Sequence, residues 1–366
     1  MTLGQLFDTA PAAATVRTLT IRRPDDFHVH LRDGAMLKAV LPFTAAQFAR
    51  GIIMPNLVPP VTTVEAAAAY RERIMAARPA GSDFDPLMTC YLTDTTSPDD
   101  IERGHGVGDG DGVWVAAKLY PAGATTNAHY GVTDIAGLAR VFERMERIGM
   151  PVLIHGEATD PAVDIFDREA VFMEQSLVPL LWRHQGLKVV VEHVTTAETL
   201  DLVRAHAPRV AGTITPHHLV LNRTALFQGG LRPHLYCLPV AKRERHRLAL
   251  RAAATSGATC FFIGTDTAPH PRSAKEAACC SAGIFGGATA LQTYVQVFDE
   301  ENALDRFEAF ASLNGARFYG LKPNAGTVVL KREPSQASAT VAVGSDEVVV
   351  FRGGENLAWS IAEVRP

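Results

Sequence analysis

The sequence predicts an α/β protein whose main unit is a (β/α)8 TIM barrel, with a short β-rich appendage at its C-terminal end. Two observations predict this fold class. Eight short runs of β-branched and aromatic residues follow one another along the chain, and helical stretches separate them. Near-continuous apolar strands that alternate with helices are typical of a parallel sheet covered on both faces. Eight such units in about 270 residues match the barrel.

The expected strands are short and apolar, as buried strands usually are. In chain order they cover residues 27–30, 51–54, 87–92, 113–120, 151–155, 189–194, 210–216 and 259–264. The second run is stopped by Pro55 and Asn56, and the eighth ends at Thr265 and Asp266.

Helical stretches lie between these runs. Residues 63–77 are rich in Ala, Glu and Arg, residues 135–148 carry apolar side chains at helical spacing, and residues 197–206 and 241–255 show similar patterns. An open doubly wound sheet is the alternative architecture. It is less favoured, because the Gly-rich phosphate-binding loop expected after its first strand does not occur here.

We expect three parts along the chain. Residues 1–18 form an Ala-rich N-terminal extension to which no function is assigned, residues 19–320 form the barrel, and residues 321–366 form the appendage. Within the appendage, residues 328–330, 339–343 and 348–351 have strand-like composition and are divided by Gly, Pro and Ser.

Composition and charge limit the function classes. The 366 residues include 47% hydrophobic and 20% charged residues, which is ordinary for a soluble protein with a large core. A formal charge of −4 argues against nucleic acid or an anionic membrane as partner, and no apolar run is long enough to span a bilayer. Five irregularly spaced cysteines and a start unlike a signal peptide favour a reduced, cytoplasmic location.

Metal-ligating residue types stand at the ends of five of the expected strands. His28 and His30 close the first strand, and alternate residues of a strand point to one side, so both can bind one cation. The others follow later strands: Lys118, His155, His193 and Asp266. In a barrel of this kind the chemistry gathers at the C-terminal strand ends. The pattern therefore predicts a hydrolytic metal centre, although each residue alone has an ordinary structural explanation.

Lys118 is the unusual member, because an ammonium group cannot bind a cation and would ordinarily form a salt bridge. If burial lowers its pKa, the neutral amine can react with carbon dioxide to give a carbamate, which offers two oxygens and can bridge two cations. Asp266 can both ligate metal and move the proton of a bound hydroxide, although a helix N-cap is its simpler explanation.

Other polar residues are expected near the same end of the barrel. Arg32 lies two residues beyond His30, and its guanidinium suits a carboxylate. Asn56 and His270 can add donors, and Glu157, His217 and His218 are left as outer or structural groups because nothing in the sequence separates those roles.

Seven motifs extend these expectations, in order from about Arg22 to about Leu321: DDFHVHLRDG, MPNLVPPVTT, AAKLYPAGATTNAHYGV, PVLIHGE, VVVEHVTT, RPHLYCLP and GTDTAPH. Together they resemble the dihydroorotases of the bacterial class that stands alone as a dimer, within the amidohydrolase superfamily. The resemblance implies reversible cyclisation of N-carbamoyl-L-aspartate to L-dihydroorotate, in pyrimidine synthesis. It also implies a homodimer, two zinc ions and a carbamylated Lys118.

The resemblance assigns a role to each matched position. His28, His30 and Asp266 would bind one metal, His155 and His193 the other, and the Lys118 carbamate both. The substrate carboxylate would be bound by Arg32, Asn56 and His270, and the ring amide by the backbones of Leu238 and Ala282. Thr125 and Thr126 would lie on a loop that closes over the site.

Two segments depart from the family pattern. The Gly- and Asp-rich residues 104–112 form a longer segment than usual, expected as an outlying loop before the fourth strand. Residues 278–281, Ala-Cys-Cys-Ser, differ from the family's usual cysteine pattern beside Ala282. A backbone contact at Ala282 tolerates that change.

The expected mechanism uses a hydroxide that bridges the metals and attacks the ring amide, with Asp266 accepting its proton and returning it to the departing nitrogen. A hydantoinase or allantoinase would use the same ligands, and a mononuclear deaminase would not need Lys118. A catalytically silent barrel that acts as a partner protein is the alternative from another class.

Overall fold

The computed structural model describes residues 16–105 and 112–366, so most of the N-terminal extension and residues 106–111 of the Gly- and Asp-rich segment lie outside it. Within these ranges, eight parallel strands form one sheet in sequential order. They are β2 (Asp26–Val29), β3 (Arg50–Ile53), β4 (Asp85–Tyr91), β5 (Trp114–Leu119), β6 (Val152–Ile154), β7 (Val189–Val191), β8 (Val210–Ile214) and β9 (Phe261–Ile263). Each corresponds to one expected strand, and the predicted barrel fold is confirmed.

The barrel closes between its first and last strands. The backbone N–H of Asp266 donates to the His28 carbonyl at 2.9 Å, and the N–H of His30 donates to the Thr267 carbonyl at 3.0 Å. The buried Asp26 carboxylate strengthens this seam by accepting hydrogen bonds from the backbone and hydroxyl of Thr265, at 2.9 and 2.6 Å. The seam therefore brings His28 and His30 beside Asp266, although more than 230 residues separate them.

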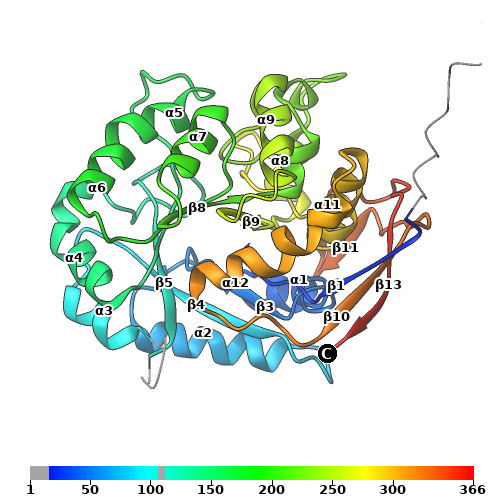
Figure 1. Cartoon of the computed structure of the whole chain (residues 1–366), viewed down its shortest axis with the longest axis horizontal. Helices are drawn as coiled ribbons and strands as arrows, with labels where there is room; N and C mark the ends of the chain where they lie inside the picture. The colour runs from blue at the N-terminus through cyan, green and yellow to red at the C-terminus, as the bar shows by residue number, and fades with distance from the viewer. Residues whose placement is uncertain (1–15, 106–111) are drawn as a thin grey trace, which may run out of the picture.

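Helices cover the outside of the barrel (Figure 1). They are α1 (Gly34–Ala45), α2 (Val64–Ala77), α3 (Pro98–Gly104), α4 (Ala139–Ile148), α5 (Arg168–Phe172), α6 (Val178–Arg183), α7 (Ala197–Ala205), α8 (Pro216–Val220), α9 (Glu244–Ala254), α10 (Arg272–Lys275), α11 (Ala290–Glu300) and α12 (Asn314–Tyr319). Capping residues set several helix ends. The Thr63 hydroxyl caps α2 by accepting a hydrogen bond from Ala66 N–H, and Gly149 ends α4 in the left-handed conformation.

Short 3-10 and π-helical turns supplement these helices. They are η1 (Ile135–Leu138), η2 (Met173–Leu177), η3 (Arg223–Leu226), η4 (Pro233–Leu235), η5 (Leu304–Arg306) and η6 (Ala309–Leu313). The expected helix at 135–148 thus starts as a 3-10 turn, and the expected helix at 241–255 begins later, at Glu244.

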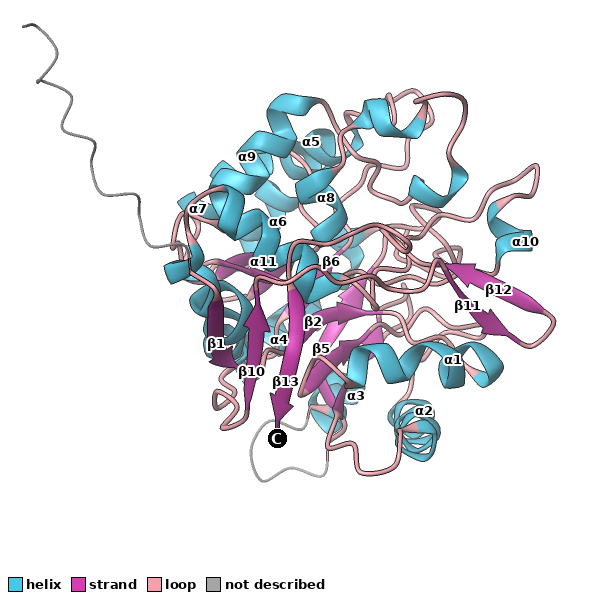
Figure 2. Ribbon diagram, turned by 90° about the vertical axis from the view of Figure 1, so that its right-hand side faces the viewer, coloured by secondary structure: helices cyan, strands magenta, loops and turns pink. Residues whose placement is uncertain are grey.

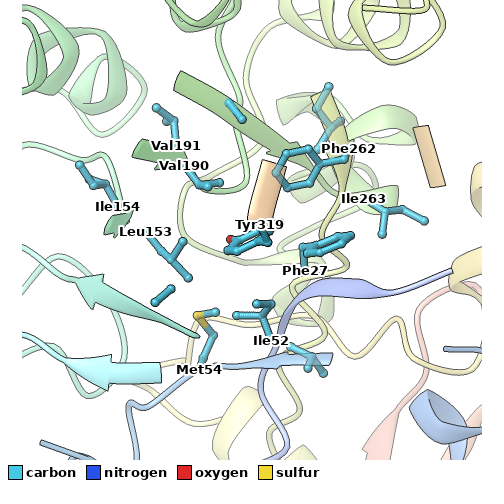
Figure 3. Close-up of a cluster of buried hydrophobic side chains, with 14 of the residues drawn as sticks. Phe27, Ile52, Met54, Leu153, Ile154, Val190, Val191, Phe262, Ile263 and Tyr319 are labelled. Carbon is cyan, nitrogen blue, oxygen red and sulfur yellow. The ribbon is translucent and has the colours of Figure 1, made fainter. Parts of the chain in front are cut away.

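The interior is apolar at the end opposite the predicted ligands. Figure 3 shows side chains from several strands converging around Tyr319, among them Phe27, Leu153, Val190 and Phe262. The rings of Phe27 and Tyr319 stack with centroids 5.3 Å apart. This packing makes the barrel interior a filled core, so the cavity for chemistry is confined to the other end.

The remaining strands form two small antiparallel sheets (Figure 2). The first joins β1 (Thr18–Arg22), β10 (Thr327–Lys331) and β13 (Ser360–Arg365), and the second is a hairpin of β11 (Thr340–Val343) and β12 (Asp346–Val349). Strands β10, β11 and β12 were expected, whereas β1 and β13 were not. The hairpin packs on α1 through a cluster that includes Val40, Phe285 and Val348. The division at residues 18 and 320 stays a prediction.

No helix in the described ranges is long and apolar enough to cross a membrane. All five cysteines are free thiols, and Cys90, Cys237 and Cys260 are buried.

Candidate metal centre and active site

The six predicted ligands converge at the C-terminal end of the barrel, and all are buried. His28 and Lys118 lie on β2 and β5, and the others follow their strands within three residues: His30, His155, His193 and Asp266. They surround a small cavity, which all of them line except Lys118. The structure also places on its wall the predicted substrate-side residues Arg32, Asn56, Thr125, Thr126, Leu238 and Ala282.

His28, His30 and Asp266 form the tightest group. The Nε2 atoms of the two histidines are 3.2 Å apart, and each lies within 3.3 Å of Asp266 Oδ1. On the other side, His155 Nδ1 and His193 Nε2 are 3.2 Å apart. A nitrogen of His193 also lies within 4.8 Å of ligand atoms of His28 and Asp266, so the two groups adjoin.

Outer hydrogen bonds fix which ring nitrogen faces inward in three of the four histidines. His28 Nδ1 is 2.8 Å from the Glu192 carboxylate, His30 Nδ1 is 2.8 Å from Asn56 Oδ1, and His155 Nε2 is 2.8 Å from the Glu157 carboxylate. Partners of this kind orient metal-binding imidazoles and set their tautomers. Glu157 therefore has an orienting contact, a role that the sequence left open.

Glu192 was not predicted as a site residue. It stands directly before His193 in a strongly apolar run, and a charged residue in such a buried strand was the available signal. Its second carboxylate contact is the Thr213 hydroxyl, which donates at 2.6 Å. The Thr213 hydroxyl therefore helps to hold the Glu192 carboxylate against His28 Nδ1.

Lys118 is fully buried, and its Nζ has no hydrogen-bond partner among the described residues. Burial lowers the pKa of its ammonium group from 10.5 to about 8, so an appreciable fraction is the neutral amine near neutral pH. The nearest aromatic face is that of Tyr120, with Nζ 4.9 Å from the ring centroid. A buried ammonium without an acceptor is costly, which makes this position unusual for a structural lysine.

The neighbouring histidines stabilise the ionised form of Asp266. Burial alone would raise the pKa of Asp266, but hydrogen bonds from His28 and His30 and electrostatic attraction to His28 and His193 hold it well below the usual range. The carboxylate therefore stays ionised. Asp266 and His193 also have left-handed backbones, with φ of 44° and 42°, and such strain in residues with side chains clusters at functional sites.

Arg32 and His270 form a second polar pair beside the cavity. Arg32 Nη2 donates to His270 Nε2 at 3.1 Å, and Arg32 Nε donates to the Pro269 carbonyl at 3.1 Å. Burial and the Arg32 charge lower the pKa of His270 to about 2, so its imidazole is neutral and accepts this bond. His270 contacts Arg32 without lining the cavity itself.

Asn56 makes two protein contacts of its own. Its Oδ1 faces His30, and its Nδ2 donates to the Thr126 carbonyl at 3.1 Å. The Thr126 hydroxyl in turn donates to the Ala282 carbonyl at 3.2 Å. The predicted loop therefore lies over the cavity, bonded to both sides of it.

Lys275 was missed by the sequence reasoning, because a lysine in a polar stretch of sequence gives no signal of burial. Its Nζ donates to the carbonyl oxygens of Tyr236, Ser281 and Gly283, each at 2.8 Å. These carbonyls belong to the two segments that bring Leu238 and Ala282 to the cavity. The ammonium therefore ties the two segments together.

The donor set fits a divalent metal. Inward-facing imidazole nitrogens and a carboxylate oxygen lie 3.2–3.3 Å apart, and oriented imidazoles with a carboxylate suit zinc. Lys118 Nζ is a buried polar atom without a partner in the described part of the chain, as expected where a cation or a modified group completes the site.

Comparison with known proteins agrees with this geometry. A model of the amidohydrolase family matches residues 25–334. A dihydroorotase of Sphingopyxis alaskensis is 59% identical over 343 residues, which cover 94% of this chain and 98% of the relative.

Solved structures show the same likeness. A dihydroorotase from Campylobacter jejuni has 31% identity and a TM-score of 0.83, covering 94% of this chain and 98% of its own. The Saccharomyces cerevisiae dihydroorotase, solved in complex with 5-fluoroorotic acid, has 29% identity and a TM-score of 0.88. The match covers 96% of this chain and 100% of the yeast chain. The resemblance read from the motifs is confirmed: the chain belongs to the amidohydrolase family and, within it, to the dihydroorotases.

Proposed function

We propose that the protein catalyses the reversible cyclisation of N-carbamoyl-L-aspartate to (S)-dihydroorotate and water, a step of pyrimidine synthesis. Its membership of the dihydroorotases supports the reaction. The observation that carries the proposal is the placement of the Arg32–His270 pair beside the His and Asp cluster, at one cavity. A ring amide and a carboxylate of one small substrate can then be bound together.

The same proposal includes two Zn²⁺ ions. His28, His30 and Asp266 would hold one, His155 and His193 the other, and Lys118, modified to N6-carboxylysine, would contribute to both. The buried Nζ with its lowered pKa supports this modification. When bound, the metals supply Lewis acidity toward the amide carbonyl and make water nucleophilic near neutral pH.

Asp266 is proposed as the proton shuttle. In hydrolysis the oxygen of water joins the ring amide carbon, the carbon–nitrogen bond breaks, and Asp266 accepts the proton of the attacking water and delivers it to the departing nitrogen. In ring formation the ureido nitrogen joins the carboxyl carbon and gives its proton to Asp266. The carbon–oxygen bond then breaks as Asp266 delivers that proton to the departing oxygen, which leaves as water. A depressed pKa keeps its carboxylate ready to accept at neutral pH.

Recognition is proposed to rest on groups around the cavity. The Arg32 guanidinium, with Asn56 and His270, would bind the substrate carboxylate, and the backbones of Leu238 and Ala282 would bind the ring amide. Thr125 and Thr126 would close over the bound ring and exclude water. The hydrogen bond from Thr126 to Ala282 supports a closing role, because it connects the loop to the far wall.

A substrate panel with metal analysis tests the proposal. We expect turnover of dihydroorotate and of N-carbamoyl-L-aspartate, little turnover of hydantoin or allantoin, and zinc in the active fraction. Preference for a ring without a carboxylate would move the protein to the hydantoinase or allantoinase class. Metal-loaded protein without activity toward any ring would favour a catalytically silent barrel.

Two further properties are part of the proposal: a homodimer and a cytoplasmic location. The free, partly buried cysteines are compatible with a reducing compartment. Sedimentation of the purified protein tests the dimer.

A further inference from the structure

A second cluster of metal-ligating side chains lies beside the candidate active site. His217 and His218 lie on α8, directly after β8, and Cys237 lies in the segment that leads to Leu238. Ligand atoms of the three residues lie within 4.8 Å of one another, and all three side chains are buried. The roles proposed for the dihydroorotase reaction use none of them.

Cys237 and His218 are already arranged around a common point. Cys237 Sγ lies 3.6 Å from His218 Nε2, and the Pro239 carbonyl oxygen lies 3.0 Å from that nitrogen and 3.4 Å from the sulfur. A sulfur, a nitrogen and an oxygen at these separations match the edges of a zinc coordination shell, whose bonds are about 2.0–2.3 Å long.

His218 has the outer partner that a metal-binding imidazole needs. Its Nδ1 lies 2.8 Å from the Thr215 hydroxyl oxygen. With the ring proton on Nδ1 donated to that oxygen, Nε2 presents its lone pair toward Cys237 and Pro239. The tautomer required for ligation is therefore one that the surroundings can stabilise.

The ring of His217, unpaired among the described residues, independently indicates that a ligand binds here. Both of its ring nitrogens are buried, and neither has a hydrogen-bond partner in the described part of the chain. Its other neighbours include the Phe351 ring, with centroids 6.2 Å apart. Burial lowers its pKa to about 4, so the ring is neutral and carries a free lone pair at physiological pH. A buried imidazole with no partner calls for an ion or a water.

We propose that His217, His218 and Cys237, with the Pro239 carbonyl oxygen, form a binding site for a thiophilic divalent cation such as Zn²⁺, separate from the metal centre at the barrel end. One sulfur, two imidazoles and one oxygen make a donor set typical of tetrahedral zinc. Binding replaces the thiol hydrogen by the metal, so one proton is released for each cation bound.

The site lies between a surface cleft and the catalytic cavity. Phe351, which faces His217, also lines an adjoining surface cleft with Leu221 and Leu235. Cys237 directly precedes Leu238 on the wall of the catalytic cavity. A cation held by Cys237 would therefore restrain the segment that carries Leu238.

Cobalt substitution tests the site, because cobalt bound by a thiolate has a charge-transfer absorption in the near ultraviolet that cobalt bound by nitrogen and oxygen lacks. The candidate catalytic ligands contain no sulfur, so this band reports the second site alone. The full chain, reconstituted with Co²⁺ in place of zinc, is expected to show the band and to release one proton with it. Absence of the band in the wild-type protein overturns the proposal.

Variants assign the band to its ligands. Cys237→Ser should abolish it, and His217→Gln should weaken cobalt binding at this site by about tenfold or more. Cys280→Ser is the matched control, because this partly exposed thiol contacts only carbonyl oxygens, and it should keep the band. A band that survives Cys237→Ser, or disappears in Cys280→Ser, overturns the assignment. The readout does not depend on turnover, so failure here and failure of the proposed reaction are distinguishable.

Discussion

The Thr126 hydroxyl donates a hydrogen bond to the Ala282 carbonyl oxygen at 3.2 Å, across 156 residues of sequence. The two residues belong to opposite walls of the same cavity. The contact fixes the loop after β5 in a position over the site. It also occupies the carbonyl oxygen of Ala282, whose backbone is proposed to bind the substrate ring.

Thr126→Val keeps the shape of the side chain and removes this hydrogen bond. We expect kcat/KM for dihydroorotate to fall by roughly 2- to 13-fold, because one hydrogen bond contributes about 0.5–1.5 kcal/mol and the closed loop loses that much stability. Steady-state kinetics measures the effect. Thr133→Val, which removes a bond to the exposed Asp94, is the control and should leave kinetics unchanged. Equal kinetics for both variants would remove Thr126 from the closing role.

Asp266→Asn removes the proton acceptor and retains an oxygen beside His28 and His30. We expect metal content to persist while turnover falls by about 10²–10⁴-fold in both directions, the usual contribution of a general acid–base group. Metal analysis and assays in both directions measure the two quantities, with the exposed Asp305→Asn as control. Normal turnover with full metal content would contradict the proton-transfer role.

Arg32→Ala removes the guanidinium proposed to bind the substrate carboxylate. A hydrogen bond to a charged group contributes about 1.5–3 kcal/mol, so kcat/KM should fall by roughly 10–100-fold, chiefly through KM. The exposed Arg73, paired with Asp33, offers a matched control as Arg73→Ala. An unchanged KM and kcat in the Arg32 variant would rule out its assignment.

Lys275→Met keeps the length of the side chain and removes the ammonium that joins Tyr236, Ser281 and Gly283. One buried and two partly buried carbonyls would lose their donor, so we expect destabilisation of about 3 kcal/mol. Below the melting temperature, KM for dihydroorotate should also rise, since Leu238 and Ala282 lose their common tether. The exposed Lys38→Met is the control. Lower stability with an unaltered KM would limit Lys275 to a structural role.

Gly315→Ala tests the apolar end of the barrel. A Cβ at this position would overlap the buried Phe27 ring, so the variant should lose about 1–3 kcal/mol of stability, as overpacked cores do. Thermal unfolding measures the loss. Gly137→Ala is the matched control, because its nearest neighbour would be Asp134 at 3.4 Å. Equal unfolding temperatures for the two variants would show that the Phe27 region adapts without cost.

The barrel was predictable because its strands are short, apolar and separated by helices in strict alternation. In a barrel, residues that follow adjacent strands become neighbours. The positions of His155 and His193 after consecutive strands therefore predict that they lie together. The same reasoning says nothing about side chains that act through backbone groups.

Three features could not be predicted from the sequence, each for its own physical reason. Lys275 ends the short helix α10 among polar residues, and only the folded chain shows its three carbonyl partners. Strand β1 pairs with β10 across about 300 residues, a distance at which no local pattern indicates pairing. The orphaned nitrogens of His217 depend on packing around the ring, which spacing in the sequence cannot reveal.

The seam between β2 and β9 has a consequence for the order of assembly. His28 and His30 are synthesised early, and Asp266 joins them only after the eighth strand leaves the ribosome. A nascent chain therefore holds an incomplete ligand set until the barrel can close. A cation bound across the seam favours the closed over the open ring by mass action, so metal supply during synthesis bears on how much chain reaches the native state.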